Sequence, residues 1–421
     1  MRLRGLRWWI IALVAIGMAT NYLARSTLSV VAAAPAFKHE WGLDPQHYSY
    51  IVAGFQIAYT IMQPVAGYVL DLLGARIGLV LFAVAWSIAN MGHALAANWM
   101  QLTAWRGFLG ASEASVIPGA VKVVGEWFPA KERSVATGWF NIGASIGGMA
   151  APPLVVWCIL NYDWRVSFIV TGALGLVWAV IWFVVYRAPA QHGAVTAEER
   201  AYIERGQPDK VIKRASWLSI VRQRKFWGLG LSRFLAEPAW QTFTFWIPLY
   251  LATSRGMDIK AIAAFGWLPF LAADLGSVVG GYLSPLFSKI FGASLLASRK
   301  LVAVTGAVLM AGPAFIGLAA DPYTAIALFC VGGFAHQVIS GAILTTSSDV
   351  FESGELATAN GLMGMSAWTG GLSFSLIVGA LATSVGYNAL FACLVAFDLF
   401  AALLLWVLVR PSDLLPRSET A

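Results

Sequence analysis

The stretch Gly67–Gly78, GYVLDLLGARIG, carries the clearest information about the fold. It ends one long apolar run and begins the next, and its glycines, Gly67 and Gly74 among them, let the chain turn within a few residues. Asp71 and Arg76 can pair or can cap neighbouring helix ends, which makes a latch that helix motion would break. Residues 281–292, GYLSPLFSKIFG, echo this stretch in a later run. Two related halves are typical of a transporter, with the site expected at the membrane midplane between them.

The composition predicts a polytopic membrane protein. Of the 421 residues, 59% are hydrophobic and 12% are charged, whereas a soluble chain carries about 25% charged residues. The first apolar run is too long for a signal peptide and is expected to be retained as the first span. The net charge of +7 collects in loops, so nucleic acid binding is not expected. The sequence has neither a nucleophile motif nor a metal-ligand cluster, so we expect no enzyme, cofactor or metal.

Apolar windows predict an all-α fold of twelve transmembrane helices in two six-helix halves. The predicted halves span residues 1–187 and 225–410, joined by a cytoplasmic loop over 188–224 and followed by a cytoplasmic tail over 411–421. The helices are predicted near 8–36, 48–71, 77–97, 101–124, 134–159, 164–187, 225–251, 260–287, 299–319, 322–348, 356–383 and 387–409.

Basic residues fix the expected orientation. With a cytoplasmic N-terminus, the inner segments hold Arg2, Arg4, Arg7, Arg76, Lys131, Arg133, Lys289, Arg299, Lys300, Arg410 and Arg417. The outer loops hold little beyond Lys38, Arg255 and Lys260. The positive-inside rule therefore places both termini in the cytoplasm.

The central loop is predicted to be a linker on the inner leaflet rather than a ligand site. It carries nine Lys or Arg from Arg187 to Lys225. Thr196 and Glu199 have the spacing of a capping box, which predicts a short surface helix there.

The glycine-rich loop between the second and third helices resembles the signature of the major facilitator superfamily. Two further segments, residues 126–134 (EWFPAKERS) and 21–25 (NYLAR), resemble the anion:cation symporter family, whose members move organic anions with protons or sodium. Four more stretches, at 48–71, 232–250, 332–342 and 357–368, look very like the bacterial hexuronate transporters, which take up galacturonate and glucuronate. The resemblance implies a bacterial inner-membrane protein that binds a hexuronate anion and a proton, and we expect a monomer.

Arg25 lies inside the first predicted helix, with seventeen uncharged residues before it and twelve after it. A central arginine costs about 2.5–3.5 kcal/mol on insertion scales, so it indicates a function unless its side chain snorkels to the surface. A guanidinium can bind a carboxylate through two parallel hydrogen bonds. The resemblance places the substrate-binding arginine at this position. It also shows a departure, because many proton-coupled relatives carry an aspartate where this chain has Ala24.

Carboxylates inside helices are the candidates for proton coupling. Glu113 shares one face of the fourth helix with Arg106, and its depth suits a proton carrier, the alternative being a fixed pair with Arg106 or Arg25. Glu237 can carry a proton or can be neutralised by Arg233 at i, i+4. Asp274 is a further candidate, and its alternative role is a hydrogen bond between helices.

Polar and aromatic groups at matching depth are the candidates for binding a sugar acid. Such a ligand needs partners for its hydroxyls and a platform for its ring. The predicted substrate-binding residues are Arg25, Tyr22, Tyr59, Gln63, Trp240, Gln241, His336, Gln337 and Trp368. The resemblance also places a binding tyrosine at Tyr59, and a kink at Glu237-Pro238 would turn Trp240 and Gln241 toward a cavity. For each polar residue the alternative is a contact between helices, and for Trp368 a packing or lipid contact.

Small residues mark two helices for close packing. Asn141, Gly143, Gly147 and Gly148 give the fifth helix a small face, and glycines recur near 361–371 in the eleventh. We expect these helices to pack closely and to rock during alternating access. Together these features predict proton-coupled hexuronate import. The alternatives are carriage of another sugar acid, such as the aldonate galactonate, and a sensor that does not transport.

Overall fold

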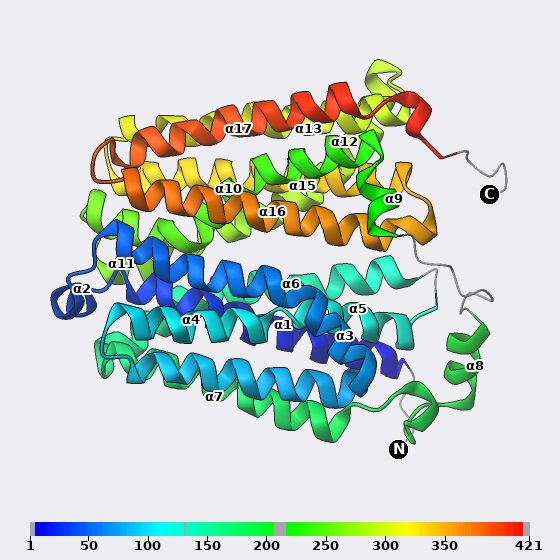
Figure 1. Ribbon diagram of the computed structural model, residues 1–421, viewed down its shortest axis with the longest axis horizontal. Helices are drawn as coiled ribbons and strands as arrows, with labels where there is room; N and C mark the ends of the chain where they lie inside the picture. The colour runs from blue at the N-terminus through cyan, green and yellow to red at the C-terminus, as the bar shows by residue number, and fades with distance from the viewer. Residues whose placement is uncertain (1–4, 130–131, 206–215, 416–421) are drawn as a thin grey trace. The chain divides into compact units, whose positions relative to one another are not determined.

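Long apolar helices make up the structure, a computed structural model that describes residues 5–129, 132–205 and 216–415 (Figure 1). Within those ranges the chain contains helices and turns and no strand, which confirms the predicted all-α fold. Several predicted features lie outside the described residues: Arg2, Arg4 and Lys131, residues 206–215 of the central loop, and residues 416–421 of the tail, which include Arg417.

The chain divides into two compact units. Unit 1 comprises Met1–Val211 together with Asp258–Trp267. Its helices are α1 (Leu6–Val31), α2 (Pro35–Trp41), α3 (Pro45–Gly92), α4 (Trp99–Glu113), α5 (Val116–Trp127), α6 (Arg133–Asn161), α7 (Trp164–Val185), α8 (Ala197–Arg205) and α11 (Ile259–Phe265), with short 3-10 turns at His93–Leu95 and Pro189–Gln191. In this unit α1 packs on α6 and α7, and α3 packs on α4 and α7.

Unit 2 comprises Ile212–Met257 and Leu268–Ala421. Its helices are α9 (Trp217–Val221), α10 (Arg224–Ser254), α12 (Leu268–Phe291), α13 (Leu295–Leu309), α14 (Ala311–Ala314), α15 (Pro322–Val350), α16 (Ser353–Leu381) and α17 (Gly386–Leu408), with 3-10 turns at Phe315–Leu318 and Pro411–Asp413. Here α10 packs on α16 and α17, while α15 packs on α12 and α13.

The helices are long enough for the predicted twelve membrane crossings. In the described ranges, nine helical segments are long and apolar enough to cross a membrane, and one of them, Pro45–Leu95, spans 51 residues. That segment holds two crossings because it breaks at Gly74, so the nine segments supply ten crossings. The α4–α5 stretch and α10 supply the other two.

Glycine and proline explain why two predicted helices are interrupted. Gly74 has φ 73° and ψ 163°, a conformation essentially restricted to glycine, so the chain turns there. The predicted helix over 101–124 breaks after Glu113 into α4 and α5. The ring of Pro118 in α5 cannot accept the helical geometry that would bond it to the carbonyl of Ala114, and a helix breaks at that point.

The predicted close packing of the fifth helix, α6, is confirmed within unit 1. A methyl group added to Gly143 would collide with the Ala15 carbonyl, and one added to Gly147 would collide with the Ala19 carbonyl. Glycine therefore allows the backbones of α1 and α6 to touch. In unit 2, Gly370 of α16 makes a similar approach to the Phe234 carbonyl of α10.

The predicted surface helix in the central loop is confirmed as α8. Thr196 Oγ1 accepts a hydrogen bond from Glu199 N at 3.1 Å. The Glu199 carboxylate does not return to Thr196 but accepts hydrogen bonds from Leu6 N and Arg7 N at 3.1 and 3.2 Å. One acidic side chain of the loop thus caps the start of α1.

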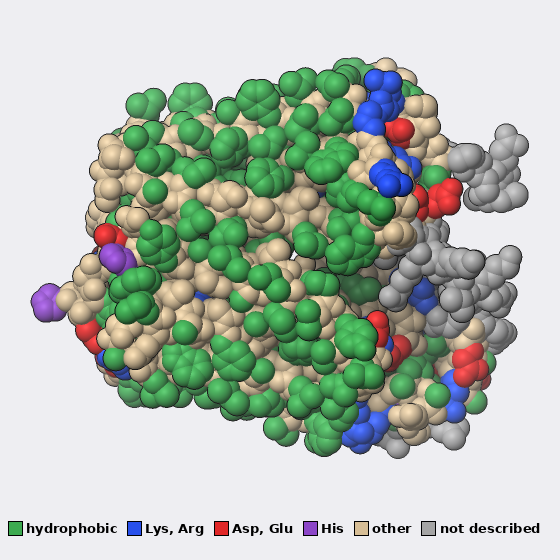
Figure 2. Space-filling view, viewed as in Figure 1, with side chains coloured by type: hydrophobic (Ala, Val, Ile, Leu, Met, Phe, Trp, Pro, Cys, Tyr) green, Lys and Arg blue, Asp and Glu red, His purple; other side chains and the backbone are tan. Residues whose placement is uncertain are grey.

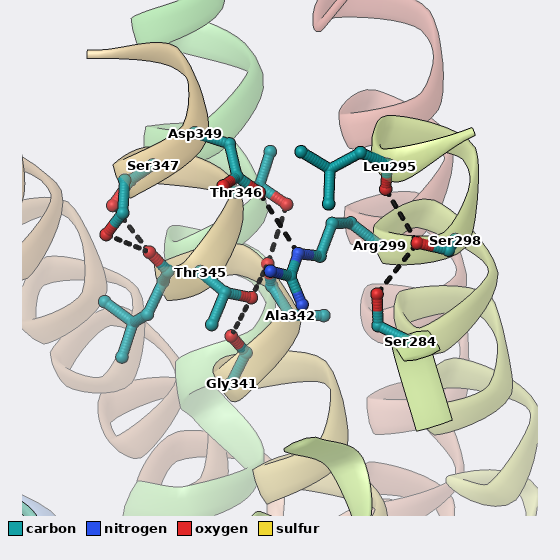
Figure 3. Close-up of polar contacts among 12 residues, drawn as sticks. Ser284, Leu295, Ser298, Arg299, Gly341, Ala342, Thr345, Thr346, Ser347 and Asp349 are labelled. Atoms are coloured by element: carbon teal, nitrogen blue, oxygen red, sulfur yellow. Dashed lines mark hydrogen bonds and ion pairs between the residues drawn. The ribbon is translucent and has the colours of Figure 1, made fainter. Parts of the chain in front are cut away.

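Charged side chains gather near the ends of the helices, and apolar side chains cover the helix sides in Figure 2. Figure 3 shows one such end in unit 2, where Arg299 of α13 bonds to Asp349 of α15 at 3.1 Å. Nearby, the hydroxyls of Ser284 and Ser298 lie 2.8 Å apart and join α12 to α13. This distribution is what a bilayer requires, because apolar surface faces the lipid and charges face water.

Candidate substrate and proton site

A buried ion pair joins α1 to α4 in unit 1. Arg25 Nε donates to Glu113 Oε2 at 2.9 Å, and the two side chains are 3% and 0% exposed. The sequence left open whether Glu113 would pair with Arg25 or Arg106, and the observed partner is Arg25. Snorkelling of Arg25 to the membrane surface, the alternative to a functional role, is wrong because the side chain is buried within the unit.

Aromatic rings surround the Arg25 guanidinium. Its Cζ lies 4.3 Å from the ring centre of Tyr22, 4.9 Å from that of Tyr59 and 5.3 Å from that of Phe55. Asn21 Oδ1 accepts a hydrogen bond from Arg25 Nη2 at 3.2 Å. Rings at this distance attract a cation and exclude water, so the guanidinium is fixed in position while its charge is kept in an apolar enclosure.

Two members of this cluster were not predicted, although the sequence holds a signal for both. Asn21 lies one helical turn before Arg25, and Phe55 lies one turn before Tyr59. Residues four apart share a helix face. Extending the predicted site by one turn on each helix would have included them.

Arg106 ties the site together from α4. Its Nη2 donates to the main-chain oxygen of Arg25 at 2.6 Å, and its Cζ lies 4.9 Å from the ring centre of Phe55. Glu113 ends α4, where the helix carries partial negative charge, and its Oε1 has no hydrogen-bond partner among the described residues. Burial and the helix end both disfavour an ionised carboxylate, so Arg25 is the group that stabilises its charge.

A second cluster lies in unit 2 along one face of α10. Arg233 Nη2 pairs with Glu237 Oε2 at 3.0 Å, and Gln241 Nε2 donates to Glu237 Oε1 at 3.2 Å. Arg233 Nη1 reaches across to Ser340 Oγ of α15 at 2.5 Å. The neutralisation of Glu237 by Arg233, which the sequence left open, is therefore present in the structure.

His336 lies one turn before Ser340 on α15 and joins the same region. Its ring stacks on Trp240 with centroids 5.7 Å apart and an interplanar angle of 15°, and Phe270 contacts the edge of Trp240 at 5.6 Å. His336 is buried, and its Nδ1 has no hydrogen-bond partner among the described residues. A flat aromatic surface beside polar groups is the arrangement that binds sugar rings.

The other predicted site residues lie apart on four helices. Gln63 is half-buried on α3, one turn beyond Tyr59, and Gln337 is half-buried on α15 next to His336. Asp274 and Trp368 are half-buried on α12 and α16. Their roles remain predictions.

The loop motif makes different contacts from those of an Asp71–Arg76 pair. Asp71 accepts from Lys122 Nζ of α5 at 2.8 Å. Arg76 Nε and Nη2 donate to the Phe183 carbonyl at 3.1 and 2.9 Å, in the last turn of α7. Arg76 thus takes the predicted capping alternative. Gly67 lies on α3, and a methyl group there would meet open space.

Many membrane-spanning helices in two units, with charges buried inside them, define a membrane carrier. Comparison with known proteins identifies its family. A family model described as Major Facilitator Superfamily matches residues 14–298, and the chain belongs to that superfamily. It is a multi-pass membrane transporter, not an enzyme.

Two curated relatives and one solved structure are similar to the chain. The hexuronate transporter of Escherichia coli (strain K12) is 52% identical over 413 residues, which cover 97% of this chain and 95% of that protein. The galacturonate transporter of Dickeya chrysanthemi is 50% identical over 77% of this chain and 95% of that protein. A crystal structure of a bacterial homolog of the human lysosomal transporter Spinster, inward-facing and occupied, superimposes with a TM-score of 0.77 at 18% identity, covering 99% of this chain and 100% of that chain. That structure supports the fold alone.

Proposed function

We propose that this protein imports hexuronates, such as galacturonate and glucuronate, by proton symport with alternating access. The relatives named for hexuronate and galacturonate transport support the substrate class. The observation that carries the proposal is the buried Arg25–Glu113 pair, because it offers a cation for a carboxylate and a carboxylate for a proton in one contact.

Arg25 is proposed to bind the substrate carboxylate in exchange for Glu113. While Glu113 is ionised it occupies Arg25 Nε, so an arriving uronate competes with an internal carboxylate. When Glu113 takes a proton, the attraction between the two side chains weakens, and the guanidinium becomes available to the substrate. Proton and anion are therefore bound together and released together. Tyr22 and Tyr59 hold the guanidinium in place during the exchange.

The groups in unit 2 are proposed to recognise the rest of the sugar. Trp240 supplies an aromatic surface, and Gln241, His336 and Gln337 supply hydrogen-bond partners for hydroxyls, with Gln63 and Trp368 as further candidates. Glu113 is our choice as proton carrier over Glu237, because both oxygens of Glu237 are already engaged. Asp274 remains a further candidate.

We also propose the topology and the gating contacts. Both termini lie in the cytoplasm of a bacterium, since the basic loops fall on that side under the positive-inside rule. The protein sits in the inner membrane and acts as a monomer. The Asp71–Lys122 pair and the turn at Gly74 form a latch that opens as the helices move.

Uptake of labelled galacturonate into proteoliposomes tests the proposal. Uptake should rise with an inward proton gradient and should be lost in Arg25→Ala, which removes the anion partner. Unlabelled glucuronate should compete, and unlabelled galactonate should compete less. Uptake that ignores the proton gradient would contradict the coupling. Absence of uronate uptake, or stronger competition by galactonate, would contradict the substrate.

A further inference from the structure

The Arg233–Glu237 pair on α10 holds a cation that is reachable but occupied. The Arg233 side chain is 15% exposed and that of Glu237 is 8% exposed. A guanidinium within a membrane-spanning helix is costly against lipid and normally faces the protein interior or a water-filled cavity. The exposed part of Arg233 is therefore expected to meet water and solutes.

Glu237 is held on Arg233 from both sides. Gln241 fixes one carboxylate oxygen and Arg233 the other, while Ser340 fixes the second Nη atom of Arg233. Arg233, Glu237 and Gln241 follow one another at intervals of four residues, so they form a row along one face of α10. Trp240 and His336, which stack in the same region, mark this face as one that can receive a sugar ring.

The position that Glu237 fills is one that a second substrate carboxylate would otherwise take. A free, partly exposed guanidinium binds carboxylates strongly, often through two hydrogen bonds. An internal carboxylate at that place both occupies the cation and repels an incoming anion. Specificity of this kind comes from an element that acts against the wrong ligand.

We propose that Glu237 makes this transporter reject sugar acids that carry a carboxylate at both ends. This inference rests on the proposed function, in which Arg25 binds the single carboxylate of a uronate. The far end of a uronate carries hydroxyl groups, which donate hydrogen bonds to Glu237. The far end of an aldarate carries a second carboxylate, which meets a like charge there. Glu237 therefore accepts the first class and excludes the second.

The test is competition by galactarate, which has the carbon skeleton of galacturonate with carboxylates at both ends. Wild type and Glu237→Gln are compared in proteoliposomes for labelled galacturonate uptake at increasing galactarate. The amide removes the negative charge and leaves Arg233 available. Glu237→Gln should be half-inhibited at a galactarate concentration about tenfold lower than wild type, the size of one charge-assisted hydrogen bond.

Two control variants make the result specific. In the double variant Arg233→Gln with Glu237→Gln the cation is absent, so the gain in galactarate sensitivity should disappear. Asp349→Asn breaks another ion pair of unit 2, that with Arg299, and should behave as wild type. If Glu237→Gln does not accumulate in the membrane, the smaller neutral variant Glu237→Ser replaces it with the same expectations.

The outcomes separate this inference from the proposed function. Unchanged galactarate sensitivity in a Glu237→Gln protein that still takes up galacturonate would overturn the inference, as would a gain that survives in the double variant. Wild type without galacturonate uptake would instead contradict the proposed function.

Discussion

Replacing Arg25 by lysine separates the charge of this residue from its shape. Lysine keeps the positive charge that compensates the buried Glu113, so the variant is expected to fold. It cannot reproduce the planar fork that bonds Glu113 through Nε and Asn21 through Nη2 at 2.9 and 3.2 Å, nor lie flat against the ring of Tyr22 at 4.3 Å. A carboxylate substrate would meet one donor group instead of two parallel N–H groups.

The expected loss is one charge-assisted hydrogen bond to the substrate. Such a bond contributes about 1.5–3 kcal/mol, which corresponds to a rise of roughly tenfold to a hundredfold in the KM for galacturonate. The maximal rate should change less, because the charge that balances Glu113 remains.

Counterflow in proteoliposomes measures this effect without a proton gradient. Vesicles loaded with unlabelled galacturonate take up labelled galacturonate at a series of external concentrations, and KM and the maximal rate are read separately. Arg165→Lys is the matched control, because Arg165 pairs with Glu40 with both side chains over a third exposed. Its KM should stay at the wild-type value. A wild-type KM in Arg25→Lys would refute the role of Arg25 as the anion-binding group.

Three further substitutions test other parts of the structure. Glu113→Gln should abolish gradient-driven accumulation while leaving counterflow exchange partly intact; equal loss of both would contradict a proton role. Gly74→Ala places a side chain at φ 73° and should lower the unfolding temperature in detergent by the equivalent of about 1–3 kcal/mol, whereas Gly67→Ala, with open space around it, should not. Hydrogen bonding to Arg165 lowers the pKa of Glu40. The stabilisation that Glu40 gives is thus present above the usual glutamate pKa of about 4.3 and is lost as the pH falls through its lower folded-state value. Thermal unfolding of wild type and Glu40→Gln should differ at neutral pH and converge in strong acid; a difference that persists in acid would contradict this.

Local sequence rules were sufficient for the helices and for much of the buried charge. The apolar runs give the crossings, the capping spacing at Thr196 gives α8, and the depth of Arg25 and Glu113 identifies both as buried groups. Each of these depends on residues close in the chain or on the thickness of the bilayer, so one sequence contains the information.

Partners that come from distant helices could not be predicted in the same way. Asp71 bonds to Lys122 rather than to Arg76, which lies five residues away in the chain. The Ser340 contact of Arg233 likewise spans 107 residues. Such contacts depend on helix rotation and on the depth to which each helix reaches. The break at Ala114 was within reach of the sequence, since Pro118 removes a helical hydrogen bond there, but the apolar pattern continues through it.

Ala24, buried directly before Arg25, has a consequence for the energy source of transport. With alanine at this position, Glu113 is the carboxylate proposed to carry the proton, and one proton with one uronate monoanion adds no net charge. The membrane voltage supplies about 2.3 kcal/mol per charge for each 100 mV, and it does no work on an electroneutral cycle. Accumulation then follows the pH difference alone, about tenfold for each pH unit. A cell using this carrier would feed on uronates in acidic surroundings even after its membrane had been electrically short-circuited.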